Sequence, residues 1–488
     1  MLKNITPEQA GLEEKYVTAF VREMQENGIN FHSMLMLRGN EIFFEKYWAP
    51  FDANTPHRMY SITKSFVAIA IGCLIDEGKL RLEDKIVDFF PDKLPETVHP
   101  FLKEQTIRDM LTMQTCFVDD GSPRTRWFQK GVTDRTAFYF SQPVVKPTGT
   151  IFDYDSNGSY IMGALVERLS GMSLLDYLKE KILNKIGDFE NSQMLQTPDG
   201  TAWGDSAMIC TPRALLNFAR FVMNYGTWDG QRLLSEEFLR DATSDLVDTD
   251  VTDWVKYDHT GYGYQIWRHP RGFSFNGMLG QFAICVPEKD FILVCTMDGS
   301  FGTGYTSPLL FRCVETYLVN HFDGGSPETP FIEETAIRVA NGEKDHPMAK
   351  KISGKTFVLE ENPMGIKWLR VDLDGDEGKL TYENAQGEKE LPFGMKKNVF
   401  APFPQAGYSN DRGNVHEIND FRYRCAASAA WCKPRKLKIK VQIVDRYFGD
   451  LVINLGFRDE NTLGVAMYKV AEDFLSEYTG WAIGYAKE

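Results

Sequence analysis

A serine and a lysine three residues apart, Ser61 and Lys64, begin a long apolar stretch of this chain. If residues 61–75 form a helix, positions i and i+3 share one face with Cβ atoms about 5–6 Å apart, so the lysine amine can reach the serine hydroxyl. A serine hydroxyl is a weak nucleophile until a neighbouring base accepts its proton. A desolvated lysine can be that base, because burial disfavours its charged form. The pair therefore predicts an activated serine.

The same spacing also suits a serine that caps a helix and a surface lysine one turn later, and on spacing alone this alternative is favoured. The residues that follow favour the activated serine instead. The run from Phe66 to Ile75 is apolar nearly all round, which indicates a helix inside a core rather than on a surface. Both side chains are therefore expected to be enclosed by protein, with Ser61 at the positive end of the helix dipole.

Two other segments place polar groups beside ordered elements. Tyr154 lies in the polar loop 152–158, after a Pro-Thr-Gly turn and before an apolar helix. Asn276 and Gly277 precede a strand-like run that begins at Gln281. A tyrosine in a loop is usually a packing residue, and a glycine beside a strand usually marks a bulge or a close backbone approach. Neither segment predicts chemistry by itself.

The elements around these segments predict one sheet assembled from both ends of a long segment. Its expected strands are 33–37, 41–47, 281–286 and 291–297. The first two are joined by an Arg-Gly-Asn hairpin turn. Between the two strand pairs, residues 80–240 have a mostly helical pattern, and further helices are expected at 6–27 and 308–322. Helices would therefore cover the sheet and position the three segments.

A change of pattern divides the chain near residue 323. Residues 323–348 are rich in Gly, Pro, Glu and Asp and are typical of a linker. Beyond them, short runs alternate with a period of two and are separated by turn residues, which is typical of a small all-β domain. We therefore expect a first domain at 1–322, a linker at 323–348 and a β domain at 349–488.

In this order and spacing, the three segments resemble the serine β-lactamase-like family, which includes class C β-lactamases, penicillin-binding proteins, family VIII carboxylesterases, D-amino-acid peptidases and 6-aminohexanoate-oligomer hydrolases. Residues 106–113 (TIRDMLTM) and 261–267 (GYGYQIW) match two further phrases of that family. The resemblance covers residues 5–322 and implies an α/β (α+β) fold, in which helices flank an antiparallel sheet and form an all-helical subdomain. The tail is expected to add a lipocalin-like antiparallel β-barrel or a sandwich.

The resemblance implies a role for each matching residue. Ser61 would be the acylated nucleophile, Lys64 would accept its proton, and Tyr154 would share the base role and protonate the leaving group. The backbone N–H groups of Ser61 and Met278 would form the oxyanion hole. Ser156 takes the third position of the family's Tyr-x-Asn or Tyr-x-Ser motif. Residues that flank these motifs or lie in the polar loop between them are further candidates for substrate contact: Asn157, Phe275, Asn276, Gly277 and Trp127.

The third motif departs from the family pattern. Many members carry a lysine or histidine that attracts a substrate carboxylate at the position of Phe275. The resemblance therefore implies an ester or amide substrate whose reactive end is uncharged, with esters ranked first because their leaving group needs less protonation. A true β-lactamase, a D-amino-acid peptidase and a non-catalytic binding protein that keeps the fold remain alternatives.

Composition excludes several other classes of function. The chain has 54 basic and 68 acidic residues and a net charge of −14, which disfavours a nucleic-acid partner. No apolar run approaches the ~20 residues of a membrane span, and no signal peptide is visible, so a cytoplasmic location is expected. Eight scattered cysteines without a Cys-x-x-Cys or His-Glu-x-x-His pattern are expected to be free thiols, with no metal and no cofactor. The oligomeric state stays open.

Overall fold

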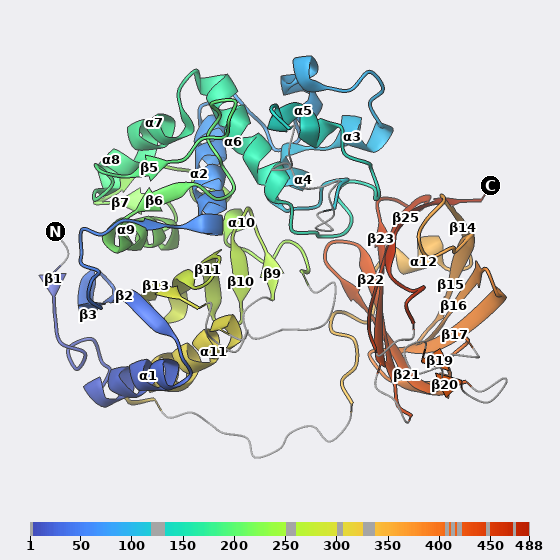
Figure 1. Ribbon diagram of the computed structural model, residues 1–488. Helices are drawn as coiled ribbons and strands as arrows, with labels where there is room; N and C mark the ends of the chain where they lie inside the picture. The colour runs from blue at the N-terminus through green and yellow to red at the C-terminus, as the bar shows by residue number, and fades with distance from the viewer. Residues whose placement is uncertain are drawn as a thin grey trace.

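The structure, a computed structural model, describes residues 3–118, 132–249, 260–299, 306–325, 337–405, 409–410, 415–416, 422–445, 449–471 and 475–487. Figure 1 shows a body in which helices surround a sheet, called the mixed body below, and a β-barrel beside it. This mixture of helices and strands with a closed C-terminal barrel confirms the predicted fold class.

The sheet of the mixed body joins strands from the two ends of its sequence, as predicted. Within the described residues its order is β1-β3-β2-β13-β12-β11-β10-β9. The two ends of the sequence meet at the pair β2 and β13, which is antiparallel and places Arg38 opposite Phe291. The strands are β1 (Lys3–Asn4), β2 (Asn30–Arg38), β3 (Glu41–Tyr47), β9 (Gly261–Tyr262), β10 (Trp267–His269), β11 (Gly272–Gly277), β12 (Gln281–Val286) and β13 (Phe291–Asp298).

Helices cover both faces of this sheet. The helices of the mixed body are α1 (Glu14–Glu26), α2 (Thr63–Asp76), α3 (Pro100–Glu104), α4 (Ile107–Leu111), α5 (Arg135–Phe140), α6 (Ser156–Ser170), α7 (Leu174–Leu178), α8 (Asn184–Ile186), α9 (Pro212–Met223), α10 (Glu236–Ala242) and α11 (Thr306–Cys313). Short strands lie among them: β4 (His57–Arg58), β5 (Gln193–Met194), β6 (Met208–Cys210), β7 (Thr227–Trp228) and β8 (Gln231–Arg232). Figure 1 shows α1 and α11 on one face and α2, α6 and α9 on the other.

The two faces of the sheet belong to two hydrophobic cores. Because side chains alternate along a strand, Leu35 and Leu37 of β2 pack in the core that contains α2. Met34 and Met36 pack in the core that contains α1 and α11. All residues of α2 from Thr63 to Leu74 are buried. The prediction of a core helix after Ser61 is therefore confirmed.

The C-terminal strands close into a barrel rather than a sandwich. Nine strands form the ring in the described part of the chain, from β17 through β16, β15, β14, β25, β24, β23 and β22 to β21. A parallel contact between β17 and β21 closes it, with Gly394 opposite Ser428. A short helix, α12 (Ala349–Ile352), precedes the ring. The described strands of this part of the chain, of which β18, β19 and β20 lie outside the ring, are β14 (Thr356–Leu359), β15 (Trp368–Asp374), β16 (Glu377–Asn384), β17 (Gly387–Met395), β18 (Val399–Pro402), β19 (Ser409–Asn410), β20 (Val415–His416), β21 (Arg424–Cys432), β22 (Lys436–Ile443), β23 (Gly449–Phe457), β24 (Thr462–Ala471) and β25 (Gly480–Ala486).

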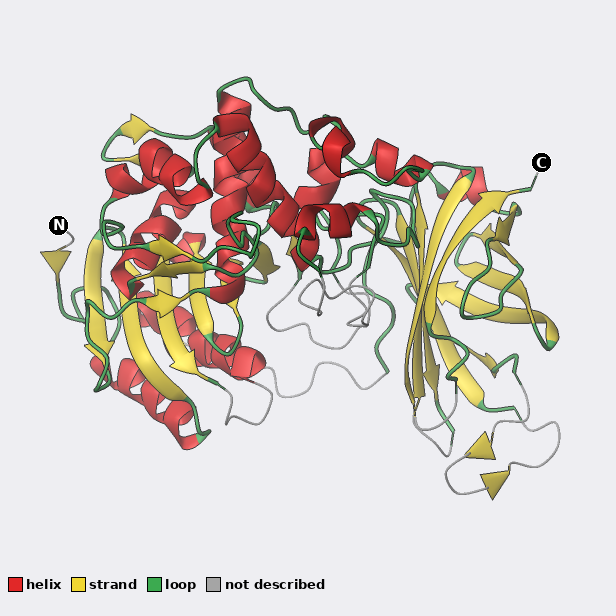
Figure 2. Cartoon of the chain, turned by 45° about the horizontal axis from the view of Figure 1, so that its top comes forward, coloured by secondary structure: helices red, strands yellow, loops and turns green. Residues whose placement is uncertain are grey.

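The barrel packs directly against the mixed body, and Figure 2 shows its strands beside the helices. Ile483 of β25 belongs to the same hydrophobic core as α2. Arg458, just after β23, forms an ion pair with Glu104 of α3, and Lys433 forms another with Asp245 at 3.1 Å. The contact thus combines apolar packing with charge pairs. All eight cysteines are buried and free, and the described helices are too short or too polar to cross a membrane.

Candidate active site

The turn before α2 presents Ser61. Ser61 lies in a short 3₁₀ turn, Tyr60–Ile62, that runs directly into the helix. Tyr60 has a φ of 48°, an uncommon backbone conformation that tertiary contacts must hold. One such contact is made by Thr63, whose Oγ1 donates to the Tyr60 carbonyl at 2.6 Å and accepts from the Met208 N–H at 2.9 Å. The turn is therefore locked to β6.

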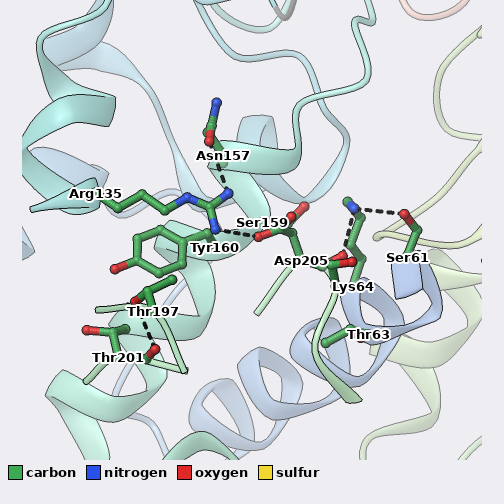
Figure 3. Close-up of polar contacts among 12 residues, drawn as sticks. Ser61, Thr63, Lys64, Arg135, Asn157, Ser159, Tyr160, Thr197, Thr201 and Asp205 are labelled. Carbon is green, nitrogen blue, oxygen red and sulfur yellow. Dashed lines mark hydrogen bonds and ion pairs between the residues drawn. The ribbon is translucent and has the colours of Figure 1, made fainter. Parts of the chain in front are cut away.

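Lys64 contacts Ser61 as the spacing predicts. Its Nζ donates to Ser61 Oγ at 3.2 Å and to the backbone carbonyl of Asp205 at 2.9 Å (Figure 3). Its residue exposure is 1%, while Ser61 is half-buried. The alternative of a surface lysine after a helix cap is therefore wrong. The amine lies between the serine hydroxyl and a carbonyl, where it can exchange a proton with the serine.

Tyr154 joins this pair from a distant segment. Lys64 Nζ lies 4.9 Å from the centroid of its ring, so the amine faces the ring. Trp267 of β10 also stacks on the ring of Tyr154, with centroids 5.5 Å apart and an interplanar angle of 18°. Tyr154 also borders a small buried cluster that contains Met113 and Phe152. The structure therefore brings Ser61, Lys64 and Tyr154 into one site.

The start of α6 holds the loop that carries Tyr154. Asp155 caps this helix: its carboxylate accepts from the Gly158 N–H at 2.8 Å and from Thr115 Oγ1 at 3.0 Å. Burial raises the pKa of Asp155 above its ordinary value, although the hydrogen bonds from Gly158 and Thr115 oppose this shift. Ser156, a predicted substrate contact, is the half-buried first residue of the helix.

A buried ion pair between Arg135 and Asp205, which the sequence did not predict, holds the residue whose carbonyl binds Lys64. Asp205, whose carbonyl accepts from Lys64, binds Arg135 Nη1 through its carboxylate at 2.7 Å. Arg135 is 2% exposed, and its Nη2 donates to the side-chain oxygen of Asn157 at 3.0 Å (Figure 3). Asn157 is thus a buried partner of Arg135 in this structure, although it was predicted to contact substrate. No local pattern in the sequence links these three residues, which come from separate segments.

The third motif, residues 275–277, approaches the turn of Ser61 with its backbone. Gly277 ends β11 against the turn of Ser61, and a Cβ at this position would lie 2.4 Å from the Met59 carbonyl oxygen. This close backbone approach explains the glycine. Met278 follows with 56% of its surface exposed, and Asn276 is half-buried.

Of the other predicted substrate contacts, Phe275 lies in the hydrophobic core. The ring of Phe275 is fully buried and packs against Phe218 of α9 at 5.4 Å and against Phe273 at 5.8 Å. In this structure its ring is therefore part of the core rather than of an open site. Trp127 lies outside the described residues. The described residues contain no group of His, Cys, Asp or Glu side chains that could hold a metal ion.

Replacing Arg135 with methionine is expected to lower the free energy of unfolding by about 3–5 kcal/mol, because the buried Asp205 carboxylate loses its partner. Urea unfolding of the purified variant measures this loss. Arg168 offers a matched control, since its ion pair with Asp92 is partly exposed and its replacement by methionine should cost about 1 kcal/mol or less. Equal losses in the two variants would contradict a supporting role for the buried pair.

Comparisons with known proteins identify the family and the fold. The family model described as Beta-lactamase matches residues 17–307. The 6-aminohexanoate-dimer hydrolase of Paenarthrobacter ureafaciens is 23% identical over 279 residues, which cover 54% of this chain and 71% of that protein. Two solved structures share the fold. SurE aligns with a TM-score of 0.52 at 15% identity over 97% of this chain and 98% of its own. EstCE1, a hydrolase with promiscuous acyltransferase activity, aligns with a TM-score of 0.50 at 15% identity over 63% of this chain and 98% of its own.

Proposed function

Because this chain belongs to the β-lactamase family, we propose that it is a serine hydrolase that cleaves small esters or amides through an acyl-enzyme on Ser61. The observation that carries the proposal is the 3.2 Å contact between Lys64 Nζ and Ser61 Oγ, inside a site that buries the lysine. The ring of Tyr154 contacts the same amine, and its phenol is a second group that can carry a proton. A nucleophile with adjacent proton-carrying groups is the arrangement that acyl transfer requires.

The proposed reaction has two stages. In the first, Ser61 Oγ attacks the substrate carbonyl carbon while its proton passes to Lys64, and the oxyanion is stabilised by the backbone N–H groups of Ser61 and Met278. The tetrahedral intermediate then collapses to the acyl-enzyme, and Tyr154 donates the proton that the departing alcohol or amine needs. In the second stage, water gives a proton to Tyr154 as it attacks the acyl carbonyl, and Lys64 returns its proton to Ser61 Oγ as the acid leaves, so both groups regain their starting state.

Two observations bear on the substrate class. Phe275 places a buried ring where many members of the family carry a cation, which favours a substrate without a carboxylate beside the reactive carbonyl. The relative named 6-aminohexanoate-dimer hydrolase acts, by its name, on a 6-aminohexanoate dimer, which favours amides with a flexible chain. We therefore propose small esters and linear amides as substrates, and a β-lactam as the less favoured alternative.

A fluorophosphonate probe tests the nucleophile directly. The full-length chain is expected to become labelled, and mass spectrometry of the digest should place the adduct on the peptide that contains Ser61. A panel of p-nitrophenyl esters, the linear 6-aminohexanoate dimer, D-amino-acid anilides and a chromogenic cephalosporin then ranks the substrates. Absence of labelling together with no turnover of any panel member would contradict the proposal. Turnover of the cephalosporin alone would favour the β-lactamase.

The division of the chain is also a proposal. Residues 1–322 would form the hydrolase domain, 323–348 the linker and 349–488 the barrel domain. The ring of strands from Thr356 to Ala486 supports this division. Ile483, however, packs into the core of the mixed body, so a hydrolase domain produced without the barrel is expected to expose part of its core.

A further inference from the structure

The loop that leads into Tyr154 is tied to the mixed body on one side. Lys146 is fully buried, and its Nζ donates to the backbone carbonyls of Thr115 and Ile151, the latter at 2.9 Å. The side chain of Gln114 donates to the Thr150 carbonyl at 3.1 Å. These bonds hold the loop at Lys146 and at the backbone carbonyls of Thr150 and Ile151, so they limit its movement at both places.

The barrel covers the other side of the same loop. Gly456 of β23 and Gly464 of β24 are directly opposite each other in the ladder. A Cβ on Gly456 would lie 2.6 Å from Ile151 Cγ1, and one on Gly464 would lie 3.2 Å from Thr150 Oγ1. Neither glycine has a positive φ, so the backbone conformation does not itself require glycine. Glycine is needed because a side chain at either position would collide with the loop. The pair forms a flat patch on the outer face of the barrel, and residues 147–151 lie against it.

Further barrel side chains reach the same loop. Lys146 Nζ lies 5.5 Å from the centroid of the Trp481 ring on β25, a cation–π contact that crosses the seam between the two bodies. Burial raises the pKa of the Tyr468 phenol on β24, and the nearby Asp153 carboxylate raises it further. Three adjacent strands, β23, β24 and β25, thus contact residues 146–153, immediately before Tyr154.

We propose that the C-terminal barrel is a positioning element of the active site, in which the glycine pair Gly456 and Gly464 holds the loop 146–153 and thereby keeps Tyr154 beside Lys64. This inference rests on the proposed function, because it assigns a catalytic consequence to the place of Tyr154. The loop has no room to move toward the barrel while it remains bonded to the mixed body. Misplacement of a catalytic group by about 1 Å can cost about 10²-fold in rate.

The test introduces a Cβ where the loop meets the barrel. Gly456→Ala is expected to lower kcat by about 10²-fold with KM changed much less, because the loop must shift while the rest of the site is untouched. Ile151→Ala removes the side chain that the new Cβ would meet. The double variant is therefore expected to regain about tenfold of the kcat lost in Gly456→Ala, a coupling that independent effects would not give. If Gly456→Ala does not fold, Gly464→Ala makes the same test with a milder contact.

A second readout needs no substrate. Hydrogen exchange of the peptide that spans residues 146–155 should become faster in Gly456→Ala. Gly378→Ala is the matched control, because its Cβ would lie 2.3 Å from the Phe393 ring inside the same barrel, away from the loop. This control should lower the melting temperature and leave both kcat and the exchange of 146–155 unchanged.

Three results would overturn the inference: unchanged kcat and exchange in Gly456→Ala, an equal loss of kcat in Gly378→Ala at the same melting temperature, or a double variant that is no better than Gly456→Ala. Failure of the proposed function is distinguishable, because it would appear as an unlabelled, inactive parent chain. An inactive parent would therefore remove the catalytic consequence, whereas the exchange data would still report whether the barrel holds the loop.

Discussion

Replacing Ser61 with alanine is expected to abolish labelling by a fluorophosphonate and to lower kcat on an ester or amide substrate by about 10⁴–10⁶-fold. The physical reason is that no acyl-enzyme can form without Oγ, so only substrate binding and the oxyanion donors remain. The fold should persist, because Ser61 is half-buried and its removal leaves Lys64 Nζ bonded to the Asp205 carbonyl. Steady-state kinetics and the melting temperature measure both effects.

Ser65 provides the matched control one turn along the same helix. It is buried, and its Oγ donates to the Gln265 carbonyl at 2.7 Å, away from Lys64. Ser65→Ala should keep labelling and kcat, and should lose about 1–3 kcal/mol of stability because a buried carbonyl loses its donor. Labelling that persists in Ser61→Ala and disappears in Ser65→Ala would show that the nucleophile has been assigned to the wrong serine.

Replacing Lys64 with methionine is expected to lower kcat by about 10⁴-fold or more, since members of a catalytic unit fail together when one is removed. Methionine fills the volume of the buried side chain without its amine. The Asp205 carbonyl then loses a donor, so the free energy of unfolding should also fall by about 1–3 kcal/mol. The burst of p-nitrophenol in a stopped-flow experiment measures acylation separately from the later hydrolysis.

Lys79 is a suitable control for this second substitution. It lies just past the end of α2 and pairs with Glu77 at 2.7 Å in a partly exposed position. Lys79→Met should change kcat by less than about twofold, because a surface ion pair contributes little. If Lys64→Met retained more than a tenth of the parent acylation rate, another group would have to accept the serine proton.

The elements of the fold follow from local patterns. The apolar run after Lys64 predicted a core helix, and twelve consecutive buried residues of α2 confirm it. The paired strand runs predicted a sheet assembled from both ends, which the β2–β13 pairing confirms. Period-two alternation predicted an all-β tail but did not distinguish a barrel from a sandwich. That choice depends on the closing contact of β17 with β21, which no local pattern encodes.

The contacts of the site are also of two kinds, those that local spacing predicts and those that only tertiary packing makes. Ser61 and Lys64 could be paired from the sequence, because helical geometry alone brings residues i and i+3 together. Asp205 lies 141 residues beyond Lys64, and Arg135 comes from a third segment, so only tertiary packing could place that carbonyl on the amine. The same reason applies to Asn157 and Phe275, whose buried partners come from other elements.

The sequence by itself therefore determined the candidate nucleophile, its lysine and the type of each main element, since these depend on spacing along a single helix or strand. Tertiary structure alone decided what supports them: the buried ion pair behind Lys64, and the flat glycine patch of the barrel against the loop of Tyr154. Both depend on segments that are far apart in the chain and meet only when the cores have formed.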